Sequence, residues 1–190
     1  TNDAFSQNSS VKVLDTDFSK GRLQNVQTIT LNDAVKLHGH LCDALVVGFL
    51  GLKETMYKLY TDSIIDRTNN RIVSKSSPCL TDIAIFMTGA RYQYNTFYVS
   101  DSIKYQFIVH RIDNEKTYGV KLKSGLLPSA IDSLGKLAVK GDLDACGIDS
   151  LRNLESQFSS FLLSKNPQDL FIIEEIKNYK GVSIHKSALD

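Results

Sequence analysis

The chain has 190 residues, with 22 Lys and Arg against 21 Asp and Glu, and 42% of the residues are hydrophobic. These values are typical of one ordinary folded domain, and a net charge of +1 gives no overall attraction to nucleic acid or anionic lipid. The longest apolar run, residues 41–52, is interrupted by Asp43 and is too short to cross a bilayer. We therefore expect a soluble domain with no nucleic-acid partner and no membrane span. A chain of this length can form a core without a metal, so any bound metal is expected to be functional.

The ends of the chain are more polar than its middle. We expect residues 1–27 to form a polar N-terminal arm, in which residues 11–14 pack onto the domain, residues 28–179 to form a single domain, and residues 180–190 to be a frayed tail. The first ten residues lack a signal-peptide pattern, and the chain does not begin with Met. Two locations are therefore open, the cytoplasm and export after removal of a signal.

The first helix is expected to begin near Leu31, because Thr30 and Asp33 have the spacing of a capping box. Apolar residues then recur every three or four positions to about Tyr60. The expected buried face comprises Ala34, Leu37, Leu41, Leu45, Gly48, Leu52, Met56 and Leu59. Gly39 disfavours helix by about 1 kcal/mol relative to Ala, so the sequence allows an interruption at that position.

The later elements are expected in the order strand, helix, antiparallel meander, two helices and returning strand. Their expected ranges are 71–75, 77–89, 95–123, 128–139, 148–164 and 170–176. Ser77-Pro78 and Gly89 mark the two ends of the helix, and Asp113-Asn114 marks a hairpin turn. Helices and strands segregated in this way predict an α+β fold with N-terminal helices, rather than a doubly wound sheet.

The segment His38-Gly39-His40-Leu41-Cys42 places two imidazoles and a thiol within five residues. Imidazole and thiolate suit zinc and other late first-row metals. In an unbroken helix His38 and Cys42 share a face while His40 points away. If the helix breaks at Gly39, Cys42 instead lies near the start of the next helix, where the helix dipole favours its thiolate. The sequence leaves both geometries open, together with the alternative that Cys42 is a buried structural residue.

A second cysteine, Cys79, follows Pro78 at the expected start of another helix. It could converge with Cys42, although spacing alone does not decide this. Weaker candidates are His110 on an alternating strand, Cys146 in a loop and His185 in the tail. The sequence contains no phosphate-binding glycine loop, zincin helix or nucleophile elbow.

These motifs resemble those of the FmdE family, which takes its name from formylmethanofuran dehydrogenase. Residues 38–42 followed by Ala44-Leu45-Val46-Val47-Gly48 resemble its His-Gly-His-x-Cys-Pro-Gly-Leu-x-x-Gly signature, with Asp43-Ala44 in place of Pro-Gly. Residues 79–84 and Thr88-Gly89 are similar to its second block, in which Ala90 replaces a cysteine. The resemblance, over roughly residues 32–176, implies an α+β fold, a bound metal that is commonly zinc, convergence of Cys42 with Cys79, and a homodimer.

Three functions follow as hypotheses. The first is a metal-binding protein, with zinc the expected ion, whose ligands come from His38, His40, Cys42 and Cys79 and whose open position would accept a small molecule. The second is a thiol-dependent redox or small-ligand-binding module, in which Cys42 is the candidate catalytic residue. The third is an accessory subunit of an oxidoreductase that docks through an aromatic strand. Its aromatic residues are Tyr92, Tyr94, Phe97 and Tyr98. The sequence does not establish whether the protein is an enzyme.

Overall fold

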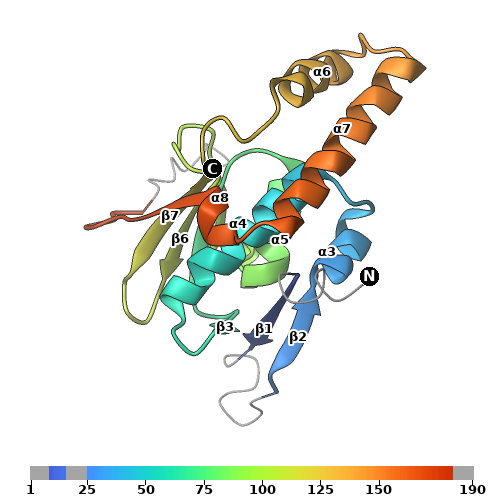
Figure 1. Cartoon of the computed structure of the whole chain (residues 1–190). Coiled ribbons are helices and arrows are strands. Elements are labelled where there is room, and N and C mark those ends of the chain that lie inside the picture. The colour runs from blue at the N-terminus through green and yellow to red at the C-terminus, as the bar shows by residue number, and fades with distance from the viewer. Residues whose placement is uncertain (1–8, 16–24, 182–190) are drawn as a thin grey trace.

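The computed structural model describes residues 9–15 and 25–181, which form helices packed against two sheets (Figure 1). The helices are α3 (Leu31–His38), α4 (Asp43–Leu59), α5 (Pro78–Thr88), α6 (Ser129–Lys140), α7 (Ala145–Ser164) and α8 (Pro167–Leu170), with a 3-10 turn at Tyr92–Tyr94. The strands are β1 (Ser10–Leu14), β2 (Gln27–Thr30), β3 (Ile64–Asp66), β4 (Asn70–Ser74), β5 (Phe97–Val99), β6 (Phe107–Arg111), β7 (Thr117–Leu122) and β8 (Phe171–Glu175). The α+β class expected from the sequence is confirmed.

The larger sheet has the strand order β5-β4-β6-β7-β8. β4, β6, β7 and β8 pair antiparallel, so the predicted hairpin and returning strand are both present. The meander expected over residues 95–123 is wrong at its first strand, because β5 pairs in parallel with the other edge of β4. A strand of three residues has too little sequence pattern to reveal its partner.

The smaller sheet, of order β2-β1-β3, lies in part within the segment expected to be a polar arm. Val11 and Val13 of β1 are buried, in agreement with the expected packing of residues 11–14. The packing occurs through strand pairing, antiparallel to β2 and parallel to β3. Residues 182–190, which cover most of the expected tail, lie outside the described residues.

Helix α4 is the centre of the core, and Figure 1 shows it between the large sheet and the other helices. Leu45, Phe49 and Leu52 are fully buried on it. Gly48 allows a close approach to α5, because an added Cβ atom would lie 2.5 Å from Cγ2 of Ile83. Close packing of α4 against α5 therefore holds the first turns of the two helices side by side.

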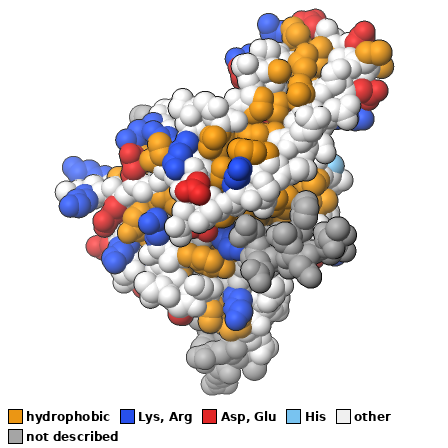
Figure 2. Space-filling model, in the orientation of Figure 1, with side chains coloured by type: hydrophobic (Ala, Val, Ile, Leu, Met, Phe, Trp, Pro, Cys, Tyr) orange, Lys and Arg blue, Asp and Glu red, His pale blue; other side chains and the backbone are white. Residues whose placement is uncertain are grey.

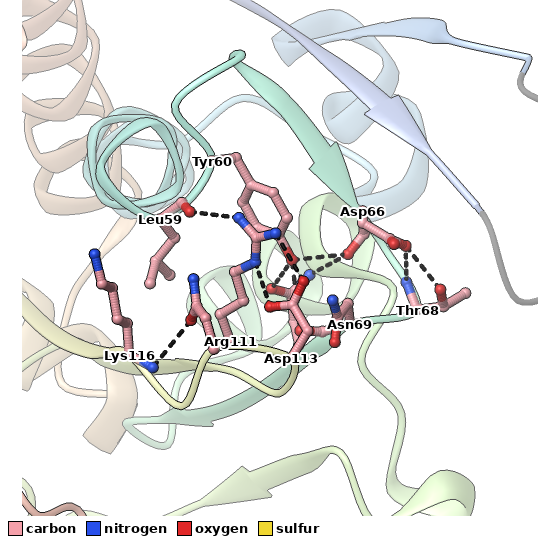
Figure 3. Close-up of polar contacts among 10 residues, drawn as sticks. Leu59, Tyr60, Asp66, Thr68, Asn69, Arg111, Asp113 and Lys116 are labelled. Atoms are coloured by element: carbon pink, nitrogen blue, oxygen red, sulfur yellow. Dashed lines mark hydrogen bonds and ion pairs between the residues drawn. The ribbon is translucent and has the colours of Figure 1, made fainter.

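The end of α4 is fastened to the β6–β7 hairpin by the guanidinium of Arg111 (Figure 3). This group donates to the Leu59 carbonyl at 2.6 Å and lies over the Tyr60 ring at 4.1 Å. It also donates two hydrogen bonds to Asp113, at 2.6 and 2.8 Å. A cation that satisfies a terminal helix carbonyl stabilises the helix end, so this contact fixes α4 relative to the sheet.

Helices α6 and α7 form a hairpin that projects from the body of the molecule, at the top right of Figure 1. The C-terminal half of α7 packs against α4, and α6 packs against α7 (Figure 1). No helix among the described residues is long and apolar enough to span a membrane.

Candidate metal centre

The predicted interruption at Gly39 separates α3 from α4. Gly39 ends α3 with a left-handed φ of 100°, and Cys42 is the N-cap of α4. Its Sγ accepts a hydrogen bond from the Leu45 amide at 3.4 Å. Because the helix restarts, Leu37 and Leu41 are 56% and 50% exposed, so the buried face expected from the sequence is wrong at these two positions.

Cys79 lies in the first turn of α5, after the N-cap Ser77 and the initial Pro78. Its Sγ lies 3.2 Å from that of Cys42, which donates a hydrogen bond to it. The two cysteines are 37 residues apart in the sequence. They meet because the starts of α4 and α5 lie next to each other.

The two histidines complete a cluster of four candidate ligands. Nδ1 of His38 lies 2.8 Å from Oδ2 of Asp82, and Nε2 lies 3.9 Å from Sγ of Cys42. The His40 ring centroid is 4.6 Å from that of His38. Donor atoms of His38, His40 and Cys42 all lie within 4.8 Å of one another. This spacing and these donor types fit a late first-row metal ion.

The four candidate ligands differ in their exposure to solvent. The His38 side chain is only 6% exposed and Cys42 is buried, while Cys79 is half-buried. His40 is exposed. The cluster therefore has a buried side at His38 and Cys42 and an open side at His40.

Hydrogen bonds distribute the protons within the cluster. The bond to Asp82 raises the pKa of His38. The bond from Cys42 lowers the pKa of Cys79 against the opposing effect of burial, and His38 lowers it further. The same hydrogen bond raises the pKa of Cys42, because the Cys42 thiol would have to give up the proton that it donates to Cys79. Burial raises the pKa of Cys42 as well. In the metal-free protein the shared hydrogen bond therefore favours the proton on Cys42 and the thiolate on Cys79.

Two further carboxyl groups adjoin the cluster. Asp43 is 8% exposed at the start of α4, and burial raises its pKa. Burial also raises the pKa of Glu155 on α7, with further contributions from the charges of Asp43 and Cys79, while His40 lowers it. Sequence reasoning missed Glu155, and no motif marked it. The sequence does place Asp82 one helical turn after Cys79, and that spacing is the signal for it.

The remaining candidates lie elsewhere. His110 on β6 is bonded to Thr117 at 2.9 Å. The loop position expected for Cys146 is wrong, because Asp144 caps α7 and places Cys146 in its first turn, where it is exposed. His185 is outside the described residues. Tyr92 and Tyr94 are exposed on the 3-10 turn, whereas Phe97 is buried on β5. The docking role of these aromatic residues stays a prediction.

A comparison with protein families matches residues 37–172 to the family described as FmdE, Molybdenum formylmethanofuran dehydrogenase operon. The chain belongs to the FmdE family. No curated protein matches it. Within this family domain, Ala90 follows Gly89, the C-cap of α5, whereas Cys79 lies at the start of that helix. The 11 residues of α5 span about 16 Å, so position 90 lies at the far end of α5 from the cluster.

Proposed function

We propose that this FmdE domain binds one zinc ion through His38, Cys42 and Cys79, with His40 as an exchangeable fourth ligand. The supporting observation is the hydrogen bond between Nδ1 of His38 and Asp82. Metal-binding histidines commonly donate one ring nitrogen to a carboxylate, which fixes the tautomer and directs the other nitrogen to the ion. Here the other nitrogen, Nε2, faces Cys42.

The surrounding residues have separate roles in this proposal. Asp82 orients the imidazole, and the Leu45 amide stabilises the Cys42 thiolate through its bond to Sγ. The exposed His40 is the ligand that a small molecule would displace. A zinc ion with an open position polarises a bound carbonyl or activates water. Glu155, whose pKa is raised, is the nearby group suited to hold a proton.

The test is elemental analysis of protein purified without chelator or histidine tag. We expect one zinc per chain in the wild type and loss of most of it in Cys42→Ser and Cys79→Ser. The matched control is Cys146→Ser, since Cys146 is exposed on α7, and this variant should retain its zinc. Wild-type protein that neither retains nor takes up a transition metal would exclude the proposal.

A second candidate, a thiol redox module, is favoured by the 3.2 Å separation of the two sulfur atoms and by the lowered pKa of Cys79. In exchange with an added disulfide such as oxidised glutathione, the Cys79 thiolate would attack one sulfur and release one glutathione thiolate. The Cys42 sulfur would then displace the second glutathione, so that the Cys42–Cys79 bond forms, the glutathione disulfide is reduced by two electrons, and the Cys42 proton passes to a glutathione thiolate. In metal-free protein at pH 7, iodoacetamide should modify Cys79 faster than Cys42. Equal and slow modification of both, until the protein is unfolded, would exclude this candidate.

A further inference from the structure

The face of the large sheet that lies away from α4 carries a second, smaller group of side chains. Val73 and Ile108 pair across β4 and β6, and with Tyr105 they form an apolar cluster separate from the main core. Arg71 and His110 are the neighbouring pair on the same two strands. The chain after β8 returns to this face, where Tyr179 packs on the cluster.

This return forms one side of a solvent-open cavity of about 420 Å³, with a smaller one of about 220 Å³ beside it. The two share Arg71, Tyr179, Lys180 and Gly181. The larger volume is within the range of small-molecule sites, roughly 300 to 1,000 Å³. His110 lines the larger cavity and Tyr98 the smaller one.

The larger cavity is lined by two cations, Arg71 and Lys180, and by one carboxylate, Glu115. Across residues 9–15 and 25–181, no ion pair forms with Arg71 or Lys180. Arg111, at the end of the strand that pairs with β4, is by contrast held by Asp113. The charge of Arg71 also contributes to the lowered pKa of His110, after burial. Two cations against the single carboxylate of Glu115 leave one excess positive charge in the lining of the larger cavity. A guanidinium without a carboxylate partner suits an oxyanion such as phosphate.

The other lining residues suit a ligand larger than an inorganic ion. The half-buried Tyr179 ring lies 6.1 Å from that of His110, and Tyr98 adds a second ring. Aromatic faces of this kind stack on planar rings. Glu115, in the turn between β6 and β7, offers a carboxylate at the edge of the larger cavity, where it can accept hydrogen bonds from hydroxyl groups.

We propose that this cavity binds a small phosphate monoester that carries hydroxyls and a planar ring, of the nucleoside monophosphate type. Arg71 and Lys180 hold the phosphate, Tyr98 and Tyr179 contact the ring, and Glu115 accepts from the hydroxyls. The site lies on the opposite face of the sheet from α4, so it does not depend on metal at the His and Cys cluster.

The experiment is a nuclear magnetic resonance titration of ¹⁵N-labelled protein with three probes, AMP, adenosine and inorganic phosphate. AMP should shift the amide signals of Arg71, His110 and residues 178–181, and should bind more tightly than either fragment. Arg71→Gln removes the guanidinium and should weaken AMP binding by about tenfold or more. Arg71→Lys keeps the charge without the planar fork and should show a smaller loss.

The matched control is Lys140→Gln, which removes one positive charge from the end of α6 and should leave AMP binding unchanged. Arg71 is exposed, so its variants should fold, and unchanged signals outside the cavity will verify this. The proposal is overturned if millimolar AMP shifts no cavity amide, or if wild type and Arg71→Gln bind AMP equally. Phosphate bound as tightly as AMP would overturn the assignment of a ring to the ligand.

Discussion

Asp82 is the residue that best distinguishes a metal ligand from a structural histidine at position 38. A buried histidine in a purely structural role needs only to satisfy its two nitrogens. His38 satisfies Nδ1 with Asp82 at 2.8 Å, whereas Nε2 faces a sulfur at 3.9 Å, a long contact for a hydrogen bond. The imidazole is thus oriented with one nitrogen engaged and the other directed at a second candidate ligand.

Asp82→Asn should weaken zinc binding by about ten- to a hundredfold, because a neutral amide orients the imidazole less strongly and makes it less basic. The measurement is a zinc competition titration against a chromogenic chelator. Asp132→Asn, which changes an exposed carboxylate paired with Lys136 on α6, is the control and should bind like the wild type. Unchanged affinity in Asp82→Asn would show that Asp82 does not support a metal ligand.

Glu155→Gln should have opposite effects on the metal-free and metal-bound protein. The folded-state pKa of Glu155 is raised above its ordinary value of 4.5, so the wild type loses stability as the pH rises from about 4.5 through the folded pKa. The variant avoids this loss, and its metal-free form should be more stable than the wild type at pH 7 but not at pH 4. In the zinc-bound protein the carboxylate of Glu155 is instead attracted to the positive ion, so Glu155→Gln should bind zinc more weakly than the wild type. Urea unfolding at both pH values and a zinc titration test this, and a variant less stable than the wild type at pH 7 would contradict it.

At the scale of elements, the sequence predicts a helix correctly where capping residues mark its ends. Thr30 and Asp33 form the expected capping box, and α5 spans the interval between Ser77-Pro78 and Gly89. The candidate ligands between the end of α3 and the start of α4 are predictable in the same way, because they occupy one continuous sequence motif. Capping and turn residues act locally, and a single sequence displays them directly.

Elements and contacts that depend on distant partners were not predictable. β1 and β3 are short, and their pairing joins residues about fifty positions apart. Glu155 approaches the cluster only because α7 packs on α4, and no pattern within α7 indicates this. The meeting of Cys42 with Cys79 was implied by the family resemblance and not by spacing, because it requires α4 and α5 to be packed at their starts.

Gly48→Ala should destabilise the protein by about 1–3 kcal/mol, because α4 and α5 would have to separate to admit the methyl group. The added Cβ would lie 2.5 Å from Ile83. Gly135→Ala on α6 is the matched control, since no atom lies within 4 Å of its added Cβ, and it should stabilise the helix by about 0.5–1 kcal/mol. Chemical unfolding of both variants is the measurement. Equal stabilisation by the two substitutions would show that α4 and α5 are not in close contact at Gly48.

At the scale of the whole molecule, the α6–α7 hairpin packs on the core with its inner side chains and projects beyond it. Figure 2 shows apolar side chains along the projecting hairpin. On the helices themselves, Leu137, Val139, Ile148 and Phe161 are 38% to 91% exposed. The hairpin carries charges of both signs, including Asp132, Lys136, Lys140 and Asp149. Two hairpins packed together about a twofold axis would form a four-helix bundle, in which the same surface of each copy, with charges of both signs, faces its equivalent.

The homodimer expected from the family resemblance should therefore form through this hairpin. Sedimentation velocity should show the wild type as a dimer, and Leu137→Ser combined with Phe161→Ser should shift it toward monomer, because the apolar area available to the second copy is reduced. Val99→Ser is the control, as Val99 is 49% exposed on β5 and lies outside the hairpin. A monomeric wild type at all concentrations would exclude the dimer, and a dimer unaffected by the double substitution would place its interface elsewhere. A dimer lost in the double variant but retained in Val99→Ser would assign the exposed apolar surface of α6 and α7 to contact with a second copy.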